Sequence, residues 1–172
     1  MKTILLTQCL LALLIIGCSE MPTSSPDNSI SNEQLEKKHP VPYRASISGG
    51  GAPPAPSTAC DGLLLTEITG QGTATHIGMF TFSQSHCLDP NNFTFSNGWL
   101  EQTAANGDKL YGTYSGYLTP TSDPIIFQVT GAFEFNGGTG RFADAEGEGE
   151  ASGLLDVTTG IVNLSLNGNI IY

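Results

Sequence analysis

The feature that most constrains this chain is an alternation of apolar and polar residues, which extends from Val41 almost to the C-terminal Tyr172. In one segment the apolar residues share a single parity: Phe127, Val129, Phe133 and Phe135. Successive side chains of a strand point to opposite faces, so this pattern predicts strands that each bury one face. No window carries an amphipathic helical stripe longer than two turns. The sequence therefore predicts an all-β domain.

Turn residues divide this alternating region into segments. Glycine accounts for 21 of the 172 residues, and only 13% of the residues are charged, as many short strands with glycine-containing turns require. The predicted turns are Asn97-Gly98, Asn106-Gly107, Pro120 to Pro124, Asn136-Gly137-Gly138 and Thr159-Gly160. Residues 41–172 provide enough chain for about eight strands of about ten residues. Closure protects sheet edges, so we predict one antiparallel eight-stranded barrel, with a β-sandwich as the alternative.

One predicted strand, from Ala143 to Gly153, has two contrasting faces. The first face carries only alanine and glycine, which lets a bulky aromatic residue approach closely or lets the strand coil tightly at a barrel corner. The second face is acidic: Asp144, Glu146, Glu148 and Glu150. Same-face residues lie about 6.6 Å apart along a strand, so the four carboxylates cannot converge on one Ca²⁺ ion without a bend. We therefore expect this acidic face to be solvated, and we predict no metal and no cofactor.

The N-terminal residues have the composition of a secretory signal. Lys2 provides a positive charge, and Ile4 to Ile16 form an apolar stretch that is too short to span a membrane. The stretch ends in Ile15-Ile16-Gly17-Cys18, which resembles the bacterial lipobox. The resemblance implies cleavage before Cys18, attachment of a diacylglyceryl group to its thiol, and acylation of its new N-terminus. We therefore predict a signal peptide at 1–17 and a lipid-anchored protein of the bacterial cell envelope. Ser19 resembles the residue that directs such proteins to the outer membrane.

The segment that follows is rich in serine, proline, asparagine and charged residues. These residue types cannot fill a core, so we predict a disordered tether at 18–40, with the barrel domain at 41–172. Of four cysteines, Cys60 and Cys87 remain in the domain. An even pair in an exported domain predicts a disulfide, whose loop of about 28 residues contributes on the order of 3.5 kcal/mol. A metal site with His76 and His86 is the weaker alternative, because no Cys-x-x-Cys or His-x-x-x-His spacing is present.

The candidate ligand-binding residues are one histidine and a set of inward-facing phenylalanines. His76 is predicted in the middle of a strand, where it acts as a base or polar anchor in a cavity, or hydrogen-bonds a core hydroxyl, or caps the barrel. Phe80, Phe82, Phe127, Phe133 and Phe135 are predicted to line the interior. Trp99, Tyr111, Tyr114 and Tyr117 offer a platform for carbohydrate, but we expect them mainly to pack in the core and the hairpins.

Three stretches of the sequence carry a resemblance to a known group of barrels. The run Asn136-Gly-Gly-Thr-Gly-Arg-Phe-Ala143, with the glycine-rich strand after it, resembles a hairpin that recurs in allene oxide cyclase-like and dirigent-like proteins. The stretches from Gly72 to Phe80 and from Ala105 to Gly112 resemble exported bacterial proteins of the same barrel group. The resemblance implies an eight-stranded barrel with an apolar interior that holds a hydrophobic substrate. Asp144 departs from the motif, which carries glycine there, and no working residue of the enzymes matches this chain.

Charge and the lack of a catalytic motif limit the functions that we expect. The formal net charge of −10 repels phosphate backbones, so we predict no nucleic-acid partner. Serine, histidine and aspartate are present, but no strand–Gly-x-Ser-x-Gly–helix context surrounds them, and no catalytic residue is assigned. We therefore expect a membrane-anchored barrel that binds a small apolar ligand or a partner. The alternatives are a cyclase- or isomerase-like enzyme acting on a hydrophobic substrate, and a structural surface protein with a filled core.

Overall fold

A computed structural model describes residues 39–172. It contains nine strands and two short 3₁₀ helices: β1 (Val41–Gly50), β2 (Ala55–Pro56), η1 (Thr58–Cys60), β3 (Leu64–Ala74), β4 (Gly78–Asp89), β5 (Thr94–Ala104), β6 (Lys109–Pro120), β7 (Ile126–Gly138), η2 (Gly140–Phe142), β8 (Glu146–Asp156) and β9 (Ile161–Ile171). The predicted signal peptide at 1–17, the lipidated Cys18 and the tether before residue 39 lie outside the described residues. No helix in the described part is long and apolar enough to cross a membrane.

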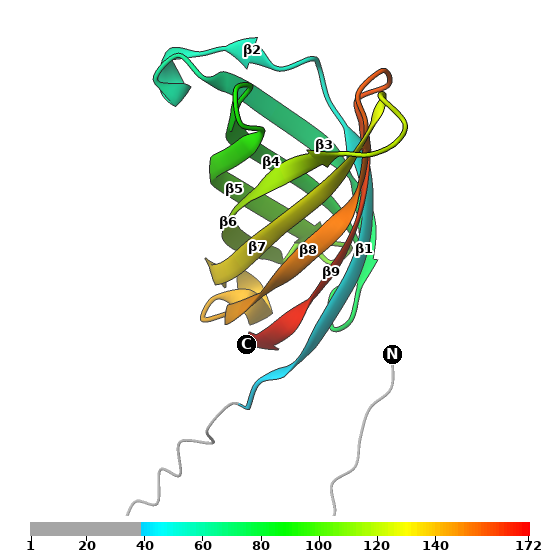
Figure 1. The fold of residues 1–172 in the computed structure, drawn as a ribbon. Coiled ribbons are helices and arrows are strands. Elements are labelled where there is room, and N and C mark those ends of the chain that lie inside the picture. Colours follow the sequence, from blue (N-terminus) through cyan, green and yellow to red (C-terminus); the bar gives the residue numbers. More distant parts are fainter. Residues whose placement is uncertain (1–38) are drawn as a thin grey trace, which may run out of the picture. The chain divides into compact units, whose positions relative to one another are not determined.

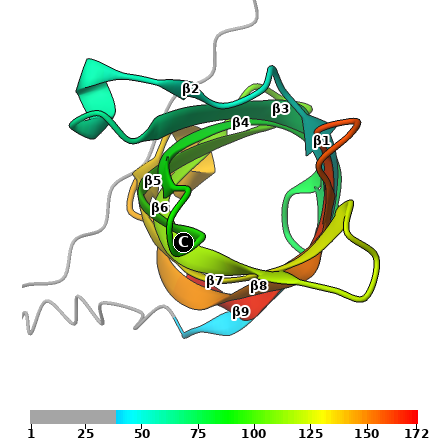
Figure 2. The ribbon, with the colours of Figure 1, turned by 45° about the horizontal axis from the view of Figure 1, so that its top comes forward.

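Eight of the strands form a closed antiparallel barrel. Each strand from β3 to β8 pairs with the next one along the chain, and β1 pairs with both β9 and β3, which closes the ring. Figure 2 shows this ring from one end, with the two-residue strand β2 outside it against β3. The predicted eight-stranded barrel is confirmed, and the sandwich alternative is wrong. The closure agrees with the alternating sequence because every strand has one inward and one outward face.

The two ends of the barrel differ in how they are covered. At the closed end, η2 places the ring of Phe142 5.4 Å from that of Tyr172, and the side chains of Phe142 and Tyr43 are fully buried. At the open end, the segment after β1 and the turns that precede β5, β7 and β9 surround the mouth. The open end is at the top of Figure 1, and the chain enters β1 from the opposite end.

Aromatic rings packed over inward-facing glycines explain the glycine content. Phe133 lies over Gly149, where an added Cβ atom would be 2.6 Å from the ring, and Phe95 lies over Gly116 in the same way. Gly149 belongs to β8, whose small-residue face was predicted to admit a bulky aromatic residue. The acidic residues of this segment are exposed, as predicted. Small inward residues on one strand thus make room for large ones on the next strand.

The Gly-Gly-Thr-Gly-Arg-Phe run has a structural role at the closed end. Gly140 has a φ of 58°, a left-handed conformation that glycine adopts without strain, and it starts the 3₁₀ turn that delivers Phe142 to the core. The guanidinium of Arg141 lies 4.7 Å from the centre of the Phe142 ring. The run at 137–142 therefore closes this end of the barrel, and we call these residues the plug.

One predicted turn is in fact part of a strand. Asn97-Gly98 lies inside β5, where it forms a β-bulge that shifts the register against both β4 and β6. Asn97 adopts a φ of 53°, and Gly98 packs against the ring of Tyr114. Asparagine followed by glycine favours left-handed backbone in turns and bulges alike, so the dipeptide alone does not distinguish them.

Candidate functional site

The barrel encloses a cavity of about 490 Å³ at its open end. This volume lies within the range of about 300–1,000 Å³ that is typical of small-molecule sites. Its mouth is bordered by Gly51–Pro54, by Phe93 and by the β8–β9 turn at Val157–Gly160. None of the plug residues at the closed end lines the cavity. The cavity is therefore a pocket with one entrance region rather than a channel.

The cavity wall is mainly apolar and carries no formal charge. No lysine, arginine, aspartate or glutamate lines it. The aliphatic and aromatic lining comes from every barrel strand and includes Ile47, Ile68, Leu88, Phe95, Leu100, Leu118, Phe127, Val129, Phe133, Leu155, Val162 and Leu166. A ligand in this cavity would exchange water for hydrocarbon over most of its surface, which favours binding by roughly 25 cal/mol per Å² of apolar area.

Small residues on two neighbouring strands help to leave this space open. Gly131 of β7 is paired with Ala151 of β8, and both residues line the cavity. Nearer the closed end, Gly149 faces the ring of Phe133, so the space above it is filled. The next inward position on β8 towards the open end is Ala151, whose methyl group reaches only a short distance into the interior. The volume therefore depends on a small side chain at position 151.

A pair of polar side chains interrupts the apolar wall. Nδ1 of His86, on β4, lies 2.8 Å from the hydroxyl oxygen of Tyr114, on β6, and the two share a hydrogen bond. The ring of Phe95 packs against both, at centroid distances of 4.9 Å from His86 and 6.0 Å from Tyr114. Both polar residues line the cavity. The pair is therefore held in one geometry and is presented to whatever occupies the interior.

Burial keeps both members of this pair uncharged. It lowers the pKa of His86 to about 4, because the imidazolium form loses hydration that no nearby carboxylate replaces. Burial likewise raises the pKa of the Tyr114 hydroxyl well above its ordinary value. At neutral pH the pair consists of a neutral imidazole and a neutral phenol. Each can donate or accept a hydrogen bond without carrying charge.

Two hydrogen-bonding groups near this pair have no protein partner. Thr66 is paired with His86 across the β3–β4 ladder and lines the cavity, and its buried hydroxyl oxygen makes no hydrogen bond. Within residues 39–172, Nε2 of His86 also has no hydrogen-bond partner, since the hydrogen bond at Nδ1 is the only one that the ring makes. A buried hydroxyl without a partner costs about 1–3 kcal/mol, so the protein alone leaves this part of the wall incompletely paired.

The closed end contains a second polar pair. There the hydroxyl of Tyr43 donates a hydrogen bond of 2.9 Å to Oε1 of Gln102, and the two side chains are almost fully buried. The rings of Phe133 and Phe135 pack edge-on against Tyr43. This pair is sealed in the core, whereas the His86–Tyr114 pair faces the cavity.

The predicted phenylalanines all face the interior, but only two of them line the cavity. Phe127 and Phe133 form part of its wall. Phe80, Phe82 and Phe135 are buried in the packed part of the core instead. Alternation predicts which side chains face inward, but it does not predict how far along the barrel each of them lies.

The predicted mid-strand position of His76 is wrong. This residue lies in the turn between β3 and β4, with a φ of 66°, and it is exposed at the closed end. Its Nε2 donates to the carbonyl oxygen of Pro42 at 3.2 Å, and its ring lies 5.7 Å from that of Tyr172. Gly78, also at positive φ, completes the turn and explains why alternation does not continue through this segment. His76 does not line the cavity.

Sequence reasoning missed His86, Tyr114 and Thr66 as a group. A signal was present, because His86 has the same parity as Phe80 and Phe82 and is therefore inward on β4. From the sequence, His86 was considered only as a ligand of the metal site that was the weaker alternative to the disulfide. Cys60 and Cys87 form the predicted disulfide, with a Cα–Cα distance of 5.4 Å. In residues 39–172, no group of histidine, cysteine, aspartate or glutamate residues is arranged to hold a metal ion.

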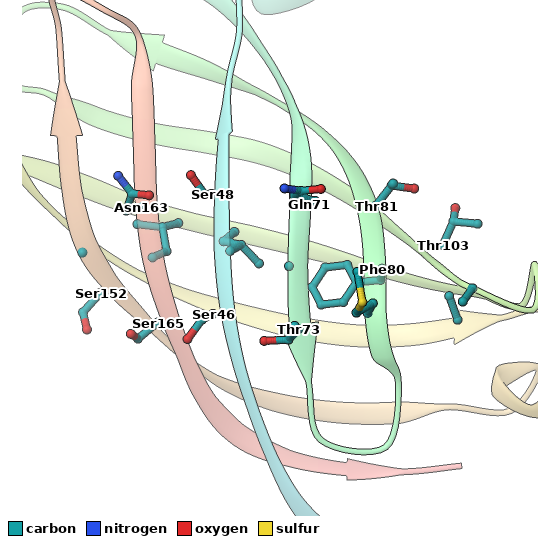
Figure 3. A pocket seen from close by; sticks show the side chains of 17 residues that line it. Ser46, Ser48, Gln71, Thr73, Phe80, Thr81, Thr103, Ser152, Asn163 and Ser165 are labelled. Carbon is teal, nitrogen blue, oxygen red and sulfur yellow. The ribbon is translucent and has the colours of Figure 1, made fainter.

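A second hollow lies on the outside of the barrel. Figure 3 shows uncharged polar side chains from six neighbouring strands along it: Ser46, Ser48, Gln71, Thr73, Thr81, Thr103, Ser152, Asn163 and Ser165. Apart from the half-buried Thr103, these side chains are exposed to water. The hollow has no buried polar group that lacks a partner, so the interior cavity is the stronger candidate site.

Comparisons with models of protein families, with curated proteins and with solved structures find no match to this chain. The function is therefore inferred from the cavity.

Proposed function

We propose that this chain is a lipid-anchored protein of the bacterial cell envelope whose barrel binds a small apolar ligand. The observation that carries the proposal is the uncharged, mainly hydrocarbon-lined cavity of about 490 Å³ at the open end of the barrel. A cavity of this kind is the usual form of a small-molecule site. The closed end is plugged by tightly packed side chains, so a ligand enters from the side opposite the start of β1.

The anchor is part of the same proposal. Its support is the run Ile15-Ile16-Gly17-Cys18, whose resemblance to the lipobox implies a lipidated Cys18. Stable attachment to a membrane requires two or more acyl chains, and a diacylglyceryl group with an N-acyl chain supplies three. We place the domain at the outer membrane because Ser19 follows the cysteine. Membership of the allene oxide cyclase-like barrel group also belongs to this proposal, supported by the Asn136–Ala143 hairpin and by the closed eight-stranded barrel.

The properties of the polar pair favour binding over catalysis. A general acid or base works best when its pKa lies near the operating pH. Burial moves the pKa of His86 down to about 4 and moves that of Tyr114 up, so neither group exchanges protons readily at neutral pH. The same two groups remain effective hydrogen-bonding partners. The pair is therefore better suited to holding a ligand than to isomerising or cyclising one.

Binding of a neutral fluorescent probe tests the proposal. The full chain is inserted into lipid nanodiscs and titrated with phenylnaphthylamine, whose emission rises in apolar surroundings, and the signal of empty nanodiscs is subtracted. Ala151→Phe places a ring in the cavity, whereas Ser152→Phe adds the same ring to the outer face of β8. We expect saturable emission from the wild type and from Ser152→Phe, and at least a tenfold loss of affinity in Ala151→Phe.

A second cavity-filling variant, Leu155→Trp, covers the case in which Ala151→Phe does not fold, and circular dichroism establishes the fold of each variant. Equal probe binding by the wild type and by a folded cavity-filling variant would overturn the proposal. No saturable binding by the wild type would do the same, and would favour a structural role.

A further inference from the structure

The cavity wall shows which chemical class of ligand it can accept. We propose that the ligand is a neutral molecule with an apolar body and one hydroxyl or carbonyl group, which hydrogen-bonds to Nε2 of His86. This inference rests on the proposed binding function and specifies its ligand.

The first step of the argument concerns charge. No lysine or arginine lines the cavity, burial keeps His86 neutral, and the chain as a whole carries a formal net charge of −10. A buried carboxylate or phosphate would lose its hydration without gaining a cationic partner, which costs several kcal/mol. A cationic ligand has the same difficulty, because no carboxylate lines the cavity. The wall therefore selects uncharged molecules.

The second step concerns the unpaired polar groups. The hydroxyl oxygen of Thr66 is buried without a hydrogen-bond partner, and His86, its neighbour across the ladder, uses only Nδ1. The second ring nitrogen of His86 has no partner in residues 39–172. The Thr66 oxygen is closed off from water, so the group that a ligand can reach is Nε2 of His86. A ligand with no polar group would leave Nε2 unpaired after water is expelled, which would weaken binding. One hydroxyl or carbonyl group on the ligand provides the missing partner.

The third step concerns the position of the polar groups within the apolar wall. His86 and Tyr114 lie on β4 and β6, and Phe95 of the intervening β5 packs against both. Most of the remaining lining is aliphatic or aromatic. The other polar lining residues are Gln84 and Ser115, beside the pair on β4 and β6, and Thr158 and Thr159 at the mouth. A ligand that fits therefore directs its polar group to the β4–β6 side of the barrel and has hydrocarbon elsewhere. Sugars and other polyhydroxylated molecules do not have this distribution.

Three probes with one skeleton test the inference: phenylbutanol, butylbenzene and phenylbutyrate. Their affinities are measured by displacement of phenylnaphthylamine from the full chain in nanodiscs at pH 8, where phenylbutyrate is charged. We expect phenylbutanol to bind roughly tenfold more tightly than butylbenzene, as one hydrogen bond of about 1.4 kcal/mol would give. We expect phenylbutyrate to bind at least tenfold more weakly than phenylbutanol.

A matched pair of histidine variants assigns the preference to the wall. His86→Phe should reduce the affinity for phenylbutanol to that for butylbenzene and leave butylbenzene binding within about twofold, since one ring replaces another. His76→Phe makes the same change in the exposed turn at the closed end and should leave the preference intact. If His86→Phe does not fold, His86→Met removes both ring nitrogens and keeps an apolar side chain, and it should also abolish the preference.

The outcomes separate this inference from the proposed function. Tightest binding of phenylbutyrate, or equal binding of phenylbutanol and butylbenzene, would overturn the inference while the cavity would still count as a binding site. A preference for phenylbutanol that survives in a folded His86→Phe or His86→Met variant would also overturn it. Failure of all three probes to displace phenylnaphthylamine, with no effect of Ala151→Phe on that dye, would overturn the proposed function itself.

Discussion

The hydroxyl of Tyr114 and Nδ1 of His86 are 2.8 Å apart, although their strands are not neighbours in the barrel. Strand β5 lies between β4 and β6. The residue of β5 that is paired with Tyr114 is Gly98, which has no side chain. A Cβ atom at Gly98 would lie 2.7 Å from the Tyr114 ring, so the ring can pack over β5 only because this residue is glycine. The β-bulge at Asn97-Gly98 thus places Tyr114 within reach of His86.

The buried imidazole predicts a pH dependence of stability. The pKa of His86 is about 4 in the folded chain and about 6.5 in the unfolded chain. Between these values the unfolded chain binds a proton that the folded chain does not, so the free energy of unfolding falls as the pH drops from 6.5 to 4. The total loss from this residue is about 3 kcal/mol at 1.36 kcal/mol per pKa unit.

Urea unfolding of the full chain at a series of pH values measures this effect. His86→Gln should have a flatter profile than the wild type between pH 6.5 and 4. His76→Gln, in the exposed turn, should keep the wild-type profile. Identical profiles for the wild type and His86→Gln would show that the imidazole is hydrated in the folded state.

The polar pair at the closed end predicts a marked asymmetry between single and double substitutions. Tyr43→Phe removes the hydrogen bond to Gln102 and leaves its buried amide oxygen unpaired, which should lower the free energy of unfolding by about 1–3 kcal/mol. Combining Tyr43→Phe with Gln102→Leu removes both partners and should restore part of this loss. A double-mutant cycle from urea titrations measures the coupling, and additive effects would mean that the two side chains do not interact.

Close packing between β7 and β8 predicts a steric effect. In Gly149→Ala the new methyl group would lie 2.6 Å from Phe133 and 2.3 Å from the carbonyl oxygen of Asn167. We expect a loss of about 1–3 kcal/mol in the free energy of unfolding, as overpacked cores show. Glu150→Ala, at the adjacent exposed position, should change stability by no more than about 0.5 kcal/mol. Equal stabilities of the two variants would contradict the packing described.

The disulfide predicts a larger effect on stability than either of these contacts. Cys60 and Cys87 are 27 residues apart, so reduction releases a loop that contributes on the order of 3.5 kcal/mol in the chain-entropy model. The double substitution Cys60→Ser/Cys87→Ser should lose a comparable amount, measured by urea unfolding. Adding reductant should lower the stability of the wild type towards that of the variant, and should leave the variant unchanged.

The proposed anchor predicts incorporation of fatty acid at one cysteine. Cells that express the full chain and are fed radiolabelled palmitate should label the wild type and not Cys18→Ser. Cys9→Ser lies within the predicted signal peptide and should leave labelling unchanged. Labelling that persists in Cys18→Ser would contradict the proposed lipid anchor.

Alternation and turn composition were sufficient to predict the barrel, because each strand needs one buried face whatever its neighbours are. They were also sufficient for the inward face of Phe127 and Phe133. They failed at Asn97-Gly98, where the same dipeptide that closes a hairpin forms a bulge inside β5. They failed again at His76, where a turn interrupts the parity that Phe80 and Phe82 continue.

The candidate site was harder to predict than the fold because its residues meet only after closure. His86 and Tyr114 are 28 positions apart, and their contact depends on a bulge and on a glycine in a third strand. The cavity depends on where inward side chains are short, as at Ala151, in relation to aromatic rings on other strands. Neither relationship is visible in a single segment of the sequence.

A crystal structure of the full chain soaked with phenylbutanol would show whether the barrel holds such a ligand. The proposed binding predicts density for one molecule inside the barrel at the open end, with its ring among the apolar side chains and its oxygen within hydrogen-bond distance of His86. A barrel interior that contains no phenylbutanol at a saturating concentration, or a molecule bound only on the outer face, would contradict it.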